Sequence, residues 1–277
     1  TYGTLFDLPF AFIETIFALK IEKVFLLKHF SLFVIYFIST FYFFLIIKEN
    51  LKNNKIALVG VLILISSPRI FSHSFYNSKD ILFLSLMIIA VYYCINLLKK
   101  FSNKKLIFAC LFCAFASNIR IIGLYLPLLT LIFYFYLDQN KKVKSDLKFT
   151  LLLVITYFLI LYIIWPFLWL DPFKNFLLIL KESTSYPNHW NFKTLYLGNY
   201  INPEHIPWHY FFVWFFATTP IIFSIIILFG LFIFIKKYSS FFFNIRFQKD
   251  IKLWKNSDQM VSLFIFLCFF IPIFFVT

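Results

Sequence analysis

Long apolar runs are the feature that most restricts the fold of this 277-residue chain. Eight of them approach the ~20 residues needed to cross the hydrocarbon core of a bilayer. They lie at about 29–47, 56–71, 81–98, 106–119, 121–137, 149–169, 209–235 and 260–277. The runs are apolar on all sides of the expected helices, and 62% of the chain is hydrophobic, which excludes a water-soluble domain. The sequence therefore predicts an all-α, polytopic transmembrane helical bundle of about eight spanning segments.

The first 27 residues differ from the rest because they mix apolar side chains with Asp7, Glu14 and Glu22. This pattern predicts a helix over 1–27 that lies along the membrane surface in a first outer loop. No linker or repeat divides the remainder, so we expect a single transmembrane domain over 1–277. Its helical bundle covers 29–277 and includes an outer loop at 170–208. We expect the chain, which begins at Thr1, to be part of a longer protein that carries a first helix upstream.

Basic residues are distributed unevenly between alternate loops. Seventeen Lys and Arg residues lie in one set of loops and six lie in the other set. The positive-inside rule makes the first set cytoplasmic, so the loops at 66–80, 118–121 and 170–208 share the outer face. The net charge of +14 is thus a topology signal, and no nucleic-acid partner is expected. All four cysteines lie in apolar runs, which predicts buried structural thiols.

The loop at 66–80 places Arg69, His73, Lys79 and Asp80 between two apolar runs. A phosphate group is well matched to a helix N-terminus with Arg and Lys nearby. A carboxylate beside that phosphate is also suited to a bridging divalent metal. The alternative interpretation is that Asp80 only caps the following helix.

Arg120 is the one charged residue between Leu106 and Leu137, and the turn that holds it must be tight. Arginine at membrane depth is costly without a partner and is a candidate functional residue. The alternative is that its side chain extends to the lipid headgroups.

The outer segment 170–208 and the residues after it combine aromatic rings with His and Glu side chains. Such sets suit a sugar, which has apolar faces and polar edges, although Trp and Tyr are also enriched at membrane interfaces. The candidates for binding sugar or acceptor are His189, Trp190, Glu204, His205, Trp208, His209 and Tyr210. The later step Thr218–Thr219–Pro220 predicts a kink in the 209–235 helix.

Two segments then resemble a known family. They are S-P-R-x-x-x-H-S-F-Y-N-x-K-D at 67–80 and P-W-H-Y-x-x-x-W-x-x-x-T-T-P at 207–220. Together with the order of the apolar runs they resemble the GT-C membrane glycosyltransferases, in particular the Rgt-like, protein O-mannosyltransferase-like and ArnT-like members. The resemblance implies inverting transfer of a sugar from a polyprenyl-phosphate donor to a glycan, lipid or protein acceptor. It also implies a multi-pass protein of the bacterial inner membrane whose active site faces the periplasm.

The resemblance further implies roles for individual residues. Asp80 matches the family's second acidic motif, which binds the donor phosphate or a divalent metal (Mg²⁺ or Mn²⁺). Arg69, Lys79 and Arg120 would stabilise the lipid-phosphate leaving group, and His73 lies in the same loop. The catalytic base belongs to the first outer loop, and we expect the main base upstream of Thr1. Asp7, a remnant of that loop, is the catalytic candidate within this sequence.

Two other functions are compatible with a polytopic helical protein. A transporter or flippase of lipid-linked glycans would show charges within helices and an internal repeat, whereas the charges here lie at run ends. A membrane scaffold without catalytic activity leaves the one-sided clustering of polar residues unexplained. The glycosyltransferase is therefore the preferred prediction, with the flippase as its alternative.

Overall fold

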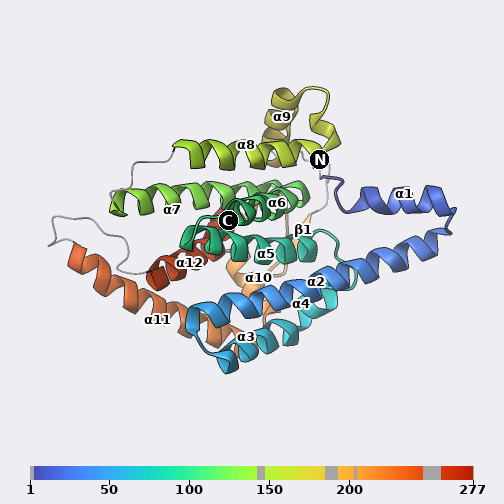
Figure 1. Cartoon of the computed structure of the whole chain (residues 1–277). Helices are drawn as coiled ribbons and strands as arrows, with labels where there is room; N and C mark the ends of the chain where they lie inside the picture. The colour runs from blue at the N-terminus through green and yellow to red at the C-terminus, as the bar shows by residue number, and fades with distance from the viewer. Residues whose placement is uncertain (1–2, 142–146, 185–192, 203–204, 246–256, 277) are drawn as a thin grey trace. The chain divides into compact units, whose positions relative to one another are not determined.

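The computed structural model describes residues 3–141, 147–184, 193–202, 205–245 and 257–276 (Figure 1). The chain divides into two compact units. The first comprises Thr1–Tyr186 and Val261–Cys268, and the second comprises Pro187–Met260 and Phe269–Thr277. Helices dominate both units, as the hydropathy predicts, and the described residues add one two-stranded hairpin in the second unit.

The first unit is an array of packed helices (Figure 1). In chain order its elements are α1 (Asp7–Phe17), α2 (Ile21–Leu51), α3 (Asn54–Ser66), α4 (Pro68–His73), α5 (Asp80–Lys99), α6 (Asn103–Ile119), the 3-10 helix η1 (Ile121–Leu124), α7 (Tyr125–Lys141), α8 (Leu147–Ile164), the 3-10 helix η2 (Pro166–Leu168) and α9 (Pro172–Thr184). Helix α2 packs on α5, α5 on α6 and α6 on α8. Because α5 and α6 are joined by a short turn, the start of α5 and the end of α6 lie at the same end of this helical hairpin.

Small buried side chains allow α5 and α6 to pack closely. Ala90 and Cys94 on α5 and Cys113 and Ala114 on α6 are at most 1% exposed. Small residues let helix backbones approach in a membrane, where burial of apolar surface from water does not drive association. The three cysteines of α5 and α6 are buried and free, which confirms the prediction of buried thiols for them; Cys268 is free and partly exposed.

Local sequence sets where the helices end. The Asn53 side chain accepts hydrogen bonds from the backbone N–H groups of Lys55 and Ile56 and so caps α3. The run predicted at 56–71 is divided, because Pro68 lacks an N–H and holds Ser67 in an extended conformation. Helix α3 therefore ends before the proline, and α4 begins at it.

The segment 1–27, predicted as one interfacial helix, contains two helices. Helix α1 ends at Phe17, where Ala18 takes a left-handed conformation with φ 44°, and α2 already begins at Ile21. A residue with a Cβ rarely adopts the left-handed conformation. This conformation ends the helix because it changes the direction of the chain. The single helix was therefore a wrong prediction, while the placement of α1 on the membrane surface stays a prediction.

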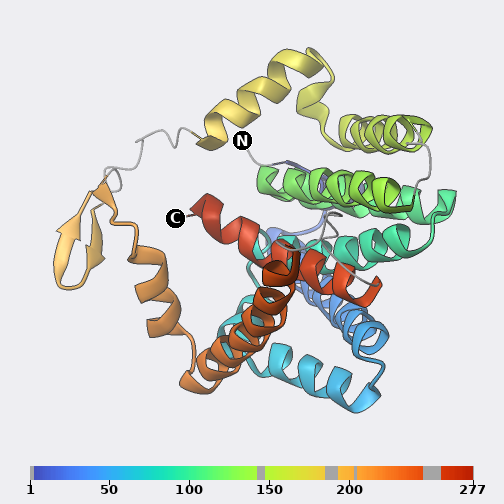
Figure 2. The same cartoon turned by 90° about the vertical axis from the view of Figure 1, so that its left-hand side faces the viewer.

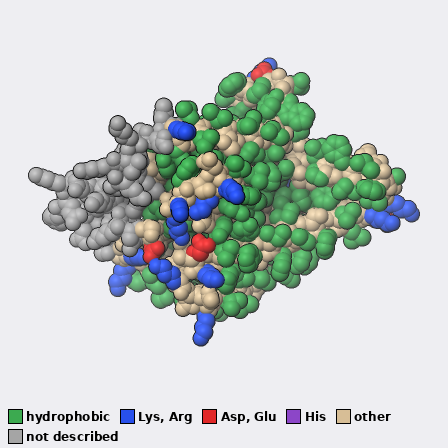
Figure 3. All heavy atoms as spheres, viewed as in Figure 1, with side chains coloured by type: hydrophobic (Ala, Val, Ile, Leu, Met, Phe, Trp, Pro, Cys, Tyr) green, Lys and Arg blue, Asp and Glu red, His purple; other side chains and the backbone are tan. Residues whose placement is uncertain are grey.

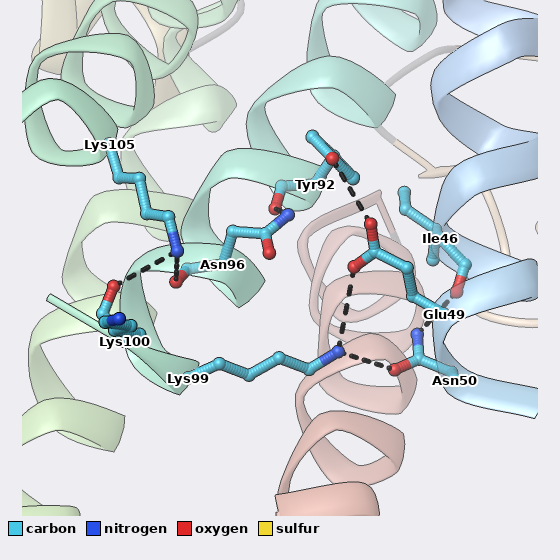
Figure 4. Close-up of polar contacts among 8 residues, drawn as sticks. All are labelled: Ile46, Glu49, Asn50, Tyr92, Asn96, Lys99, Lys100 and Lys105. Carbon is cyan, nitrogen blue, oxygen red and sulfur yellow. Dashed lines mark hydrogen bonds and ion pairs between the residues drawn. The ribbon is translucent and has the colours of Figure 1, made fainter. Parts of the chain in front are cut away.

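A polar cluster joins α2 to α5 at the end of α5 that lies away from Asp80 (Figure 4). The Lys99 ammonium lies 3.9 Å from a carboxylate oxygen of Glu49 and donates to the Asn50 side chain at 3.4 Å. Tyr92 donates to the same Glu49 carboxylate at 3.3 Å. These contacts hold the end of α2 against the end of α5.

The second unit begins, among its described residues, with a hairpin of β1 (Thr194–Tyr196) and β2 (Asn199–Ile201) (Figure 2). The strands are antiparallel with Tyr196 opposite Asn199, and the turn has positive φ at Leu197 (48°) and Gly198 (86°). Positive φ at both central residues is typical of the tight turn that matches the twist of a hairpin.

Helices α10 (Tyr210–Thr218) and α11 (Ile221–Ile245) follow the hairpin. Thr219 between them is extended (φ −97°, ψ 127°), because Pro220 disfavours a helical conformation in the residue before it. The run at 209–235 is thus two helices rather than the one kinked helix that the sequence predicted.

Four helical segments are long and apolar enough to cross a membrane among the residues that the structure describes. They are Ile21–Leu51, Asp80–Lys99, Ile221–Ser239 and Ser257–Phe274, the last within α12 (Ser257–Val276). Shorter apolar helices cover Asn54–Ser66, Ile121–Tyr136 and Lys148–Ile164. Hydrophobic side chains also cover much of the described part of the face shown in Figure 3. The chain is an integral membrane protein, and the count of about eight spans stays a prediction.

Candidate functional site

The start of α5 is organised by Asn77, which precedes the helix by three residues. Its side-chain oxygen accepts hydrogen bonds from the backbone N–H groups of Lys79, at 3.2 Å, and Asp80, at 2.9 Å. Asn77 therefore performs the capping that the sequence allowed for Asp80. Asp80 is the first helical residue, and the hydrogen bonds of its carboxylate come from the side chains of Asn77 and Arg120. The interpretation of Asp80 as a simple cap is wrong, and its carboxylate is available for other contacts.

Arg120 reaches Asp80 from the turn between α6 and η1. The turn is tight, as predicted: a Cβ on Gly123 would lie 2.8 Å from the backbone nitrogen of Ser117. The Arg120 guanidinium donates to an Asp80 carboxylate oxygen and forms an ion pair with it. The loops at 66–80 and 118–121 thus meet, as the charge asymmetry predicts. Arg120 binds a protein carboxylate, a contact that the headgroup alternative does not require.

Arg120 also keeps donor capacity that the described residues do not use. Its Nε is buried and has no hydrogen-bond partner among them. A guanidinium carries five N–H donors, and a buried donor without a partner is costly. The side chain is about a third exposed, at 38%, so part of it faces outward. Arg120 is therefore anchored by Asp80 and still able to bind an anionic group.

His73 joins the same set of residues through Asn77. The Asn77 side-chain nitrogen lies 3.0 Å from the second carboxylate oxygen of Asp80 and 2.9 Å from Nδ1 of His73. The hydrogen-bonded series His73, Asn77, Asp80 and Arg120, which we call the Asp80 cluster, draws on α4, the loop before α5, α5 itself and the turn after α6. Three of these residues were predicted as site residues. Asn77 was missed, although asparagine is among the residue types that most often cap a helix N-terminus.

The other two predicted phosphate-binding residues, Arg69 and Lys79, lie beside the Asp80 cluster in sequence. Arg69 is on α4 and Lys79 directly precedes Asp80, and both are exposed. The three positive charges of Arg69, Lys79 and Arg120 exceed the single negative charge of Asp80 in this part of the chain. Their predicted contact with a donor phosphate stays a prediction.

Asn118 fixes the N-terminal segment two residues before Arg120. Its backbone oxygen accepts from Gly3 N–H at 2.9 Å, and its side-chain oxygen accepts from Leu5 N–H at 3.1 Å. The Asn118 side chain is 1% exposed and also donates to the Ile164 carbonyl at 3.4 Å. A Cβ on Gly3 would lie only 2.1 Å from the Asn118 side-chain oxygen, so the approach requires glycine. Sequence reasoning missed this contact, because nothing local in the sequence links the two positions.

Asp7, the predicted remnant of the first outer loop, is the first residue of α1. Its carboxylate accepts a hydrogen bond from the Lys28 ammonium on α2 at 2.9 Å. The Lys28 ammonium also lies 5.9 Å from the centre of the Phe10 ring. This ion pair fastens α1 to α2, and the proposed catalytic role of Asp7 stays a prediction.

An apolar cavity of about 430 Å³ lies between α1, α2, α5 and α6. It is lined by Leu5, Phe6, Pro9, Phe10, Ser31, Ile35, Ile38, Tyr42, Leu82, Leu86, Ile89, Phe112 and Phe115. Leu82 and Leu86 follow Asp80 on the same helix, so they lie within about 9 Å of it along the helix axis. The cavity and the Asp80 cluster therefore share helix α5, and the apolar lining of the cavity is suited to a hydrocarbon group.

The predicted sugar-binding residues belong to the second unit. His189, Trp190 and Glu204 lie outside the described residues. His205 and Trp208 are exposed, and the Trp208 ring meets His209 edge-on at 5.5 Å.

Tyr196 on β1 joins this aromatic group, and sequence reasoning had not singled it out. Its ring centre lies 5.8 Å from that of His209 and 5.1 Å from that of Tyr210. The hairpin thus packs on the start of α10. That these aromatic residues bind a sugar stays a prediction.

The donor atoms around Asp80 do not favour a divalent metal. Such ions take several oxygen ligands, whereas the Asp80 carboxylate already accepts from Arg120 and Asn77. In the described part of the chain, no group of three or more His, Cys, Asp and Glu side chains could hold a metal ion. Magnesium or manganese at Asp80 stays a prediction, and the mechanism proposed below involves no metal.

Comparison with known proteins identifies the family. Searches of curated proteins and of solved structures found no match. The family model for dolichyl-phosphate-mannose-protein mannosyltransferases matches residues 8–169, more than half of the chain. The matched region includes the whole Asp80 cluster and the residues that line the cavity from Pro9 onward. The chain belongs to the dolichyl-phosphate-mannose-protein mannosyltransferase family, whose members are GT-C-type membrane glycosyltransferases.

Proposed function

We propose that this protein transfers a sugar from a polyprenyl-phosphate carrier to a glycan, lipid or protein acceptor on the outer face of the membrane. The observation that carries the proposal is that the Asp80 cluster and the apolar cavity share α5. A ligand with a phosphate next to a long hydrocarbon chain would place its phosphate at Arg120 and its chain in the cavity. Family membership supports a glycosyltransferase of the mannosyltransferase type.

The proposed reaction is a single inverting displacement. The acceptor hydroxyl attacks the anomeric carbon of the sugar while the bond from that carbon to the phosphate oxygen breaks, and the acceptor proton passes to a carboxylate base. The polyprenyl phosphate leaves with the electrons of the broken bond. Negative charge therefore grows on its oxygen, where a cation fixed in advance lowers the barrier.

Arg120 is the residue of the cluster best suited to that role. Asp80 holds the guanidinium in place without using all of its N–H groups, so the side chain is oriented before the donor binds. Arg69 and Lys79 add positive charge in the neighbouring loop. The base is not one of the four residues of the Asp80 cluster; Asp7 is its candidate in this chain, although Lys28 holds its carboxylate.

The charge asymmetry of the loops supports the orientation. The Asp80 cluster lies at the end of α5 opposite to Lys99 and its basic neighbours, and basic loops face the cytoplasm. We accordingly place the cluster on the periplasmic face of a bacterial inner membrane.

A transfer assay tests the proposed function. Membranes that contain the full protein are incubated with polyprenyl-phosphate mannose labelled in the sugar, and the label is followed into lipid, glycan and protein fractions. We expect transfer by the wild type, loss of transfer by Asp80→Ala and retained transfer by Glu49→Ala, the carboxylate of the ion pair at the other end of α5. Movement of the lipid-linked sugar across the bilayer without transfer would support the flippase instead, and unchanged transfer by Asp80→Ala would refute the role of Asp80.

A further inference from the structure

We propose that Asn77 is a positioning residue that keeps the proton of His73 on Nε2 and thereby makes His73 a hydrogen-bond donor to the phosphate of the lipid carrier. The ligand named here rests on the proposed function, whereas the state of the ring follows from the structure. Asn77 is suited to the role because its side chain makes four hydrogen bonds, two through its oxygen and two through its nitrogen.

The orientation of the Asn77 amide is fixed by what surrounds it. Its oxygen faces two backbone N–H groups, those of Lys79 and Asp80, and its nitrogen faces the Asp80 carboxylate. The opposite orientation would place an oxygen against a carboxylate and an N–H₂ group against two N–H donors. Each of those contacts is repulsive, so only the observed orientation satisfies all the groups.

The state of the His73 ring follows from this orientation. An amide nitrogen donates hydrogen bonds and cannot accept one, so Nδ1 of His73, at 2.9 Å, must be the acceptor. A ring nitrogen that accepts carries no proton, which leaves the proton of the neutral ring on Nε2. The two hydrogens of the Asn77 nitrogen are then both used, one by His73 and one by Asp80.

The Nε2–H group has no hydrogen-bond partner among the residues that the structure describes, and the ring is only partly buried. The Tyr76 ring, with its centre 5.1 Å away and tilted by 39°, packs beside the imidazole and limits its rotation. His73 therefore presents an oriented donor in the same cluster as Arg120. A phosphate oxygen is the acceptor in the proposed substrate that this donor would meet.

Glutamine and asparagine distinguish the two ring nitrogens. His73→Gln carries its amide nitrogen at the position of Nε2, whereas the His73→Asn side chain ends at the position of Nδ1 and leaves no donor at the position of Nε2. The probe is undecaprenyl phosphate, and undecaprenol is the uncharged control, each titrated into the purified protein in lipid nanodiscs. We expect affinity for undecaprenyl phosphate close to wild type in His73→Gln and a loss of about tenfold or more in His73→Asn, since that variant loses a hydrogen bond to a charged group.

A spectroscopic measurement tests the ring without any ligand. Protein labelled with ¹⁵N only at histidine is compared with His73→Gln, which lacks one histidine and so identifies the His73 signals. We expect a protonated Nε2 and an unprotonated Nδ1 in the wild type, and a mixture of both neutral forms in Asn77→Ala. Asn53→Ala is the matched control, because it removes an equivalent helix cap from α3 and should leave the His73 signals unchanged.

The outcomes separate this inference from the proposed function. Wild-type protein that binds undecaprenyl phosphate no better than undecaprenol would overturn the proposed phosphate ligand, while the ¹⁵N signals would still decide the role of Asn77. Equal affinity of His73→Gln and His73→Asn, in a protein that does select the phosphate, would overturn the role of His73 as donor. A proton found on Nδ1 in the wild type would overturn the inference as a whole.

Discussion

Arg120 donates a hydrogen bond to the carboxylate of Asp80, a residue 40 positions earlier in the chain and on the other arm of the α5–α6 hairpin. The contact joins the turn after α6 to the first residue of α5. It holds a cation with an unused donor on the α5–α6 hairpin, and both helices of this hairpin also line the apolar cavity.

The ion pair predicts non-additive effects on sugar transfer. Asp80→Asn and Arg120→Gln should each lower the initial rate about tenfold or more, because each removes a charged hydrogen-bonding group next to the leaving phosphate. The double variant should lose less than the product of the two losses, since both act through one contact. The matched cycle of Glu49→Gln and Lys99→Gln should leave the rate within about twofold, because that pair lies at the other end of α5, away from the leaving phosphate. A fully additive Asp80–Arg120 cycle would show that the two residues act independently.

The cavity predicts a dependence on the length of the lipid chain. Ser31→Phe would fill part of the cavity from α2 and should raise the KM for a long-chain polyprenyl donor several-fold, with a smaller effect on a donor of two isoprene units. Phe30→Trp adds bulk to the neighbouring position, which is 67% exposed, and should change neither value. Steady-state kinetics with the two donors provides the measurement. Equal effects on both donors would indicate that the chain lies elsewhere.

The contact between Gly3 and Asn118 predicts an effect on stability. Gly3→Ala would bring a methyl group into the Asn118 side chain, so the segment before α1 must detach or shift, at a cost of about 1–3 kcal/mol. We expect a lower melting temperature and faster proteolytic cleavage near α1. Gly230→Ala is the control, because a Cβ there meets nothing within 4 Å and alanine favours the helix. Melting temperatures equal to wild type in both variants would contradict the anchoring role of Asn118.

The proposed orientation predicts which end of the α5–α6 hairpin faces outward. Ser72→Cys lies on α4 near the Asp80 cluster, and Asn103→Cys lies at the other end of the hairpin; both positions are exposed. A membrane-impermeant thiol reagent should label Ser72→Cys in intact cells and Asn103→Cys only after the membrane is opened. The parent chain is the control, because three of its native cysteines are buried. The reverse labelling pattern would invert the topology.

The sequence was sufficient for the features that depend on hydropathy and on isolated charges. Apolar runs predicted the helices, and the lone Arg120 between uncharged runs was recognised as a candidate before its partner was known. That Arg120 and Asp80 lie on the same side of the membrane required only that alternate loops share a face, whereas their contact was not predicted.

Features that depend on side-chain geometry could not be predicted in the same way. Asn77 was visible in the sequence, but the hydrogen bonds that its side-chain oxygen and nitrogen make depend on the fold of the turn after α4. The Asn118 contact joins positions 113 residues apart and has no local signal. The helix expected over 1–27 failed for a local reason, because Ala18 adopts a left-handed conformation that its residue type does not favour.

The short connection between α5 and α6 has a consequence for how the protein is made. Asp80 and Arg120 belong to neighbouring helices, and contacts between neighbouring helices form early because little chain must be ordered to make them. Asn77 and His73 precede both, so all four members of the Asp80 cluster are synthesised by the time α6 is complete. We expect a nascent chain that is stalled once α6 and Arg120 have left the ribosomal exit tunnel to have its Asp80 cluster already assembled. Co-translational insertion would then build the most polar part of the molecule before its C-terminal helices exist.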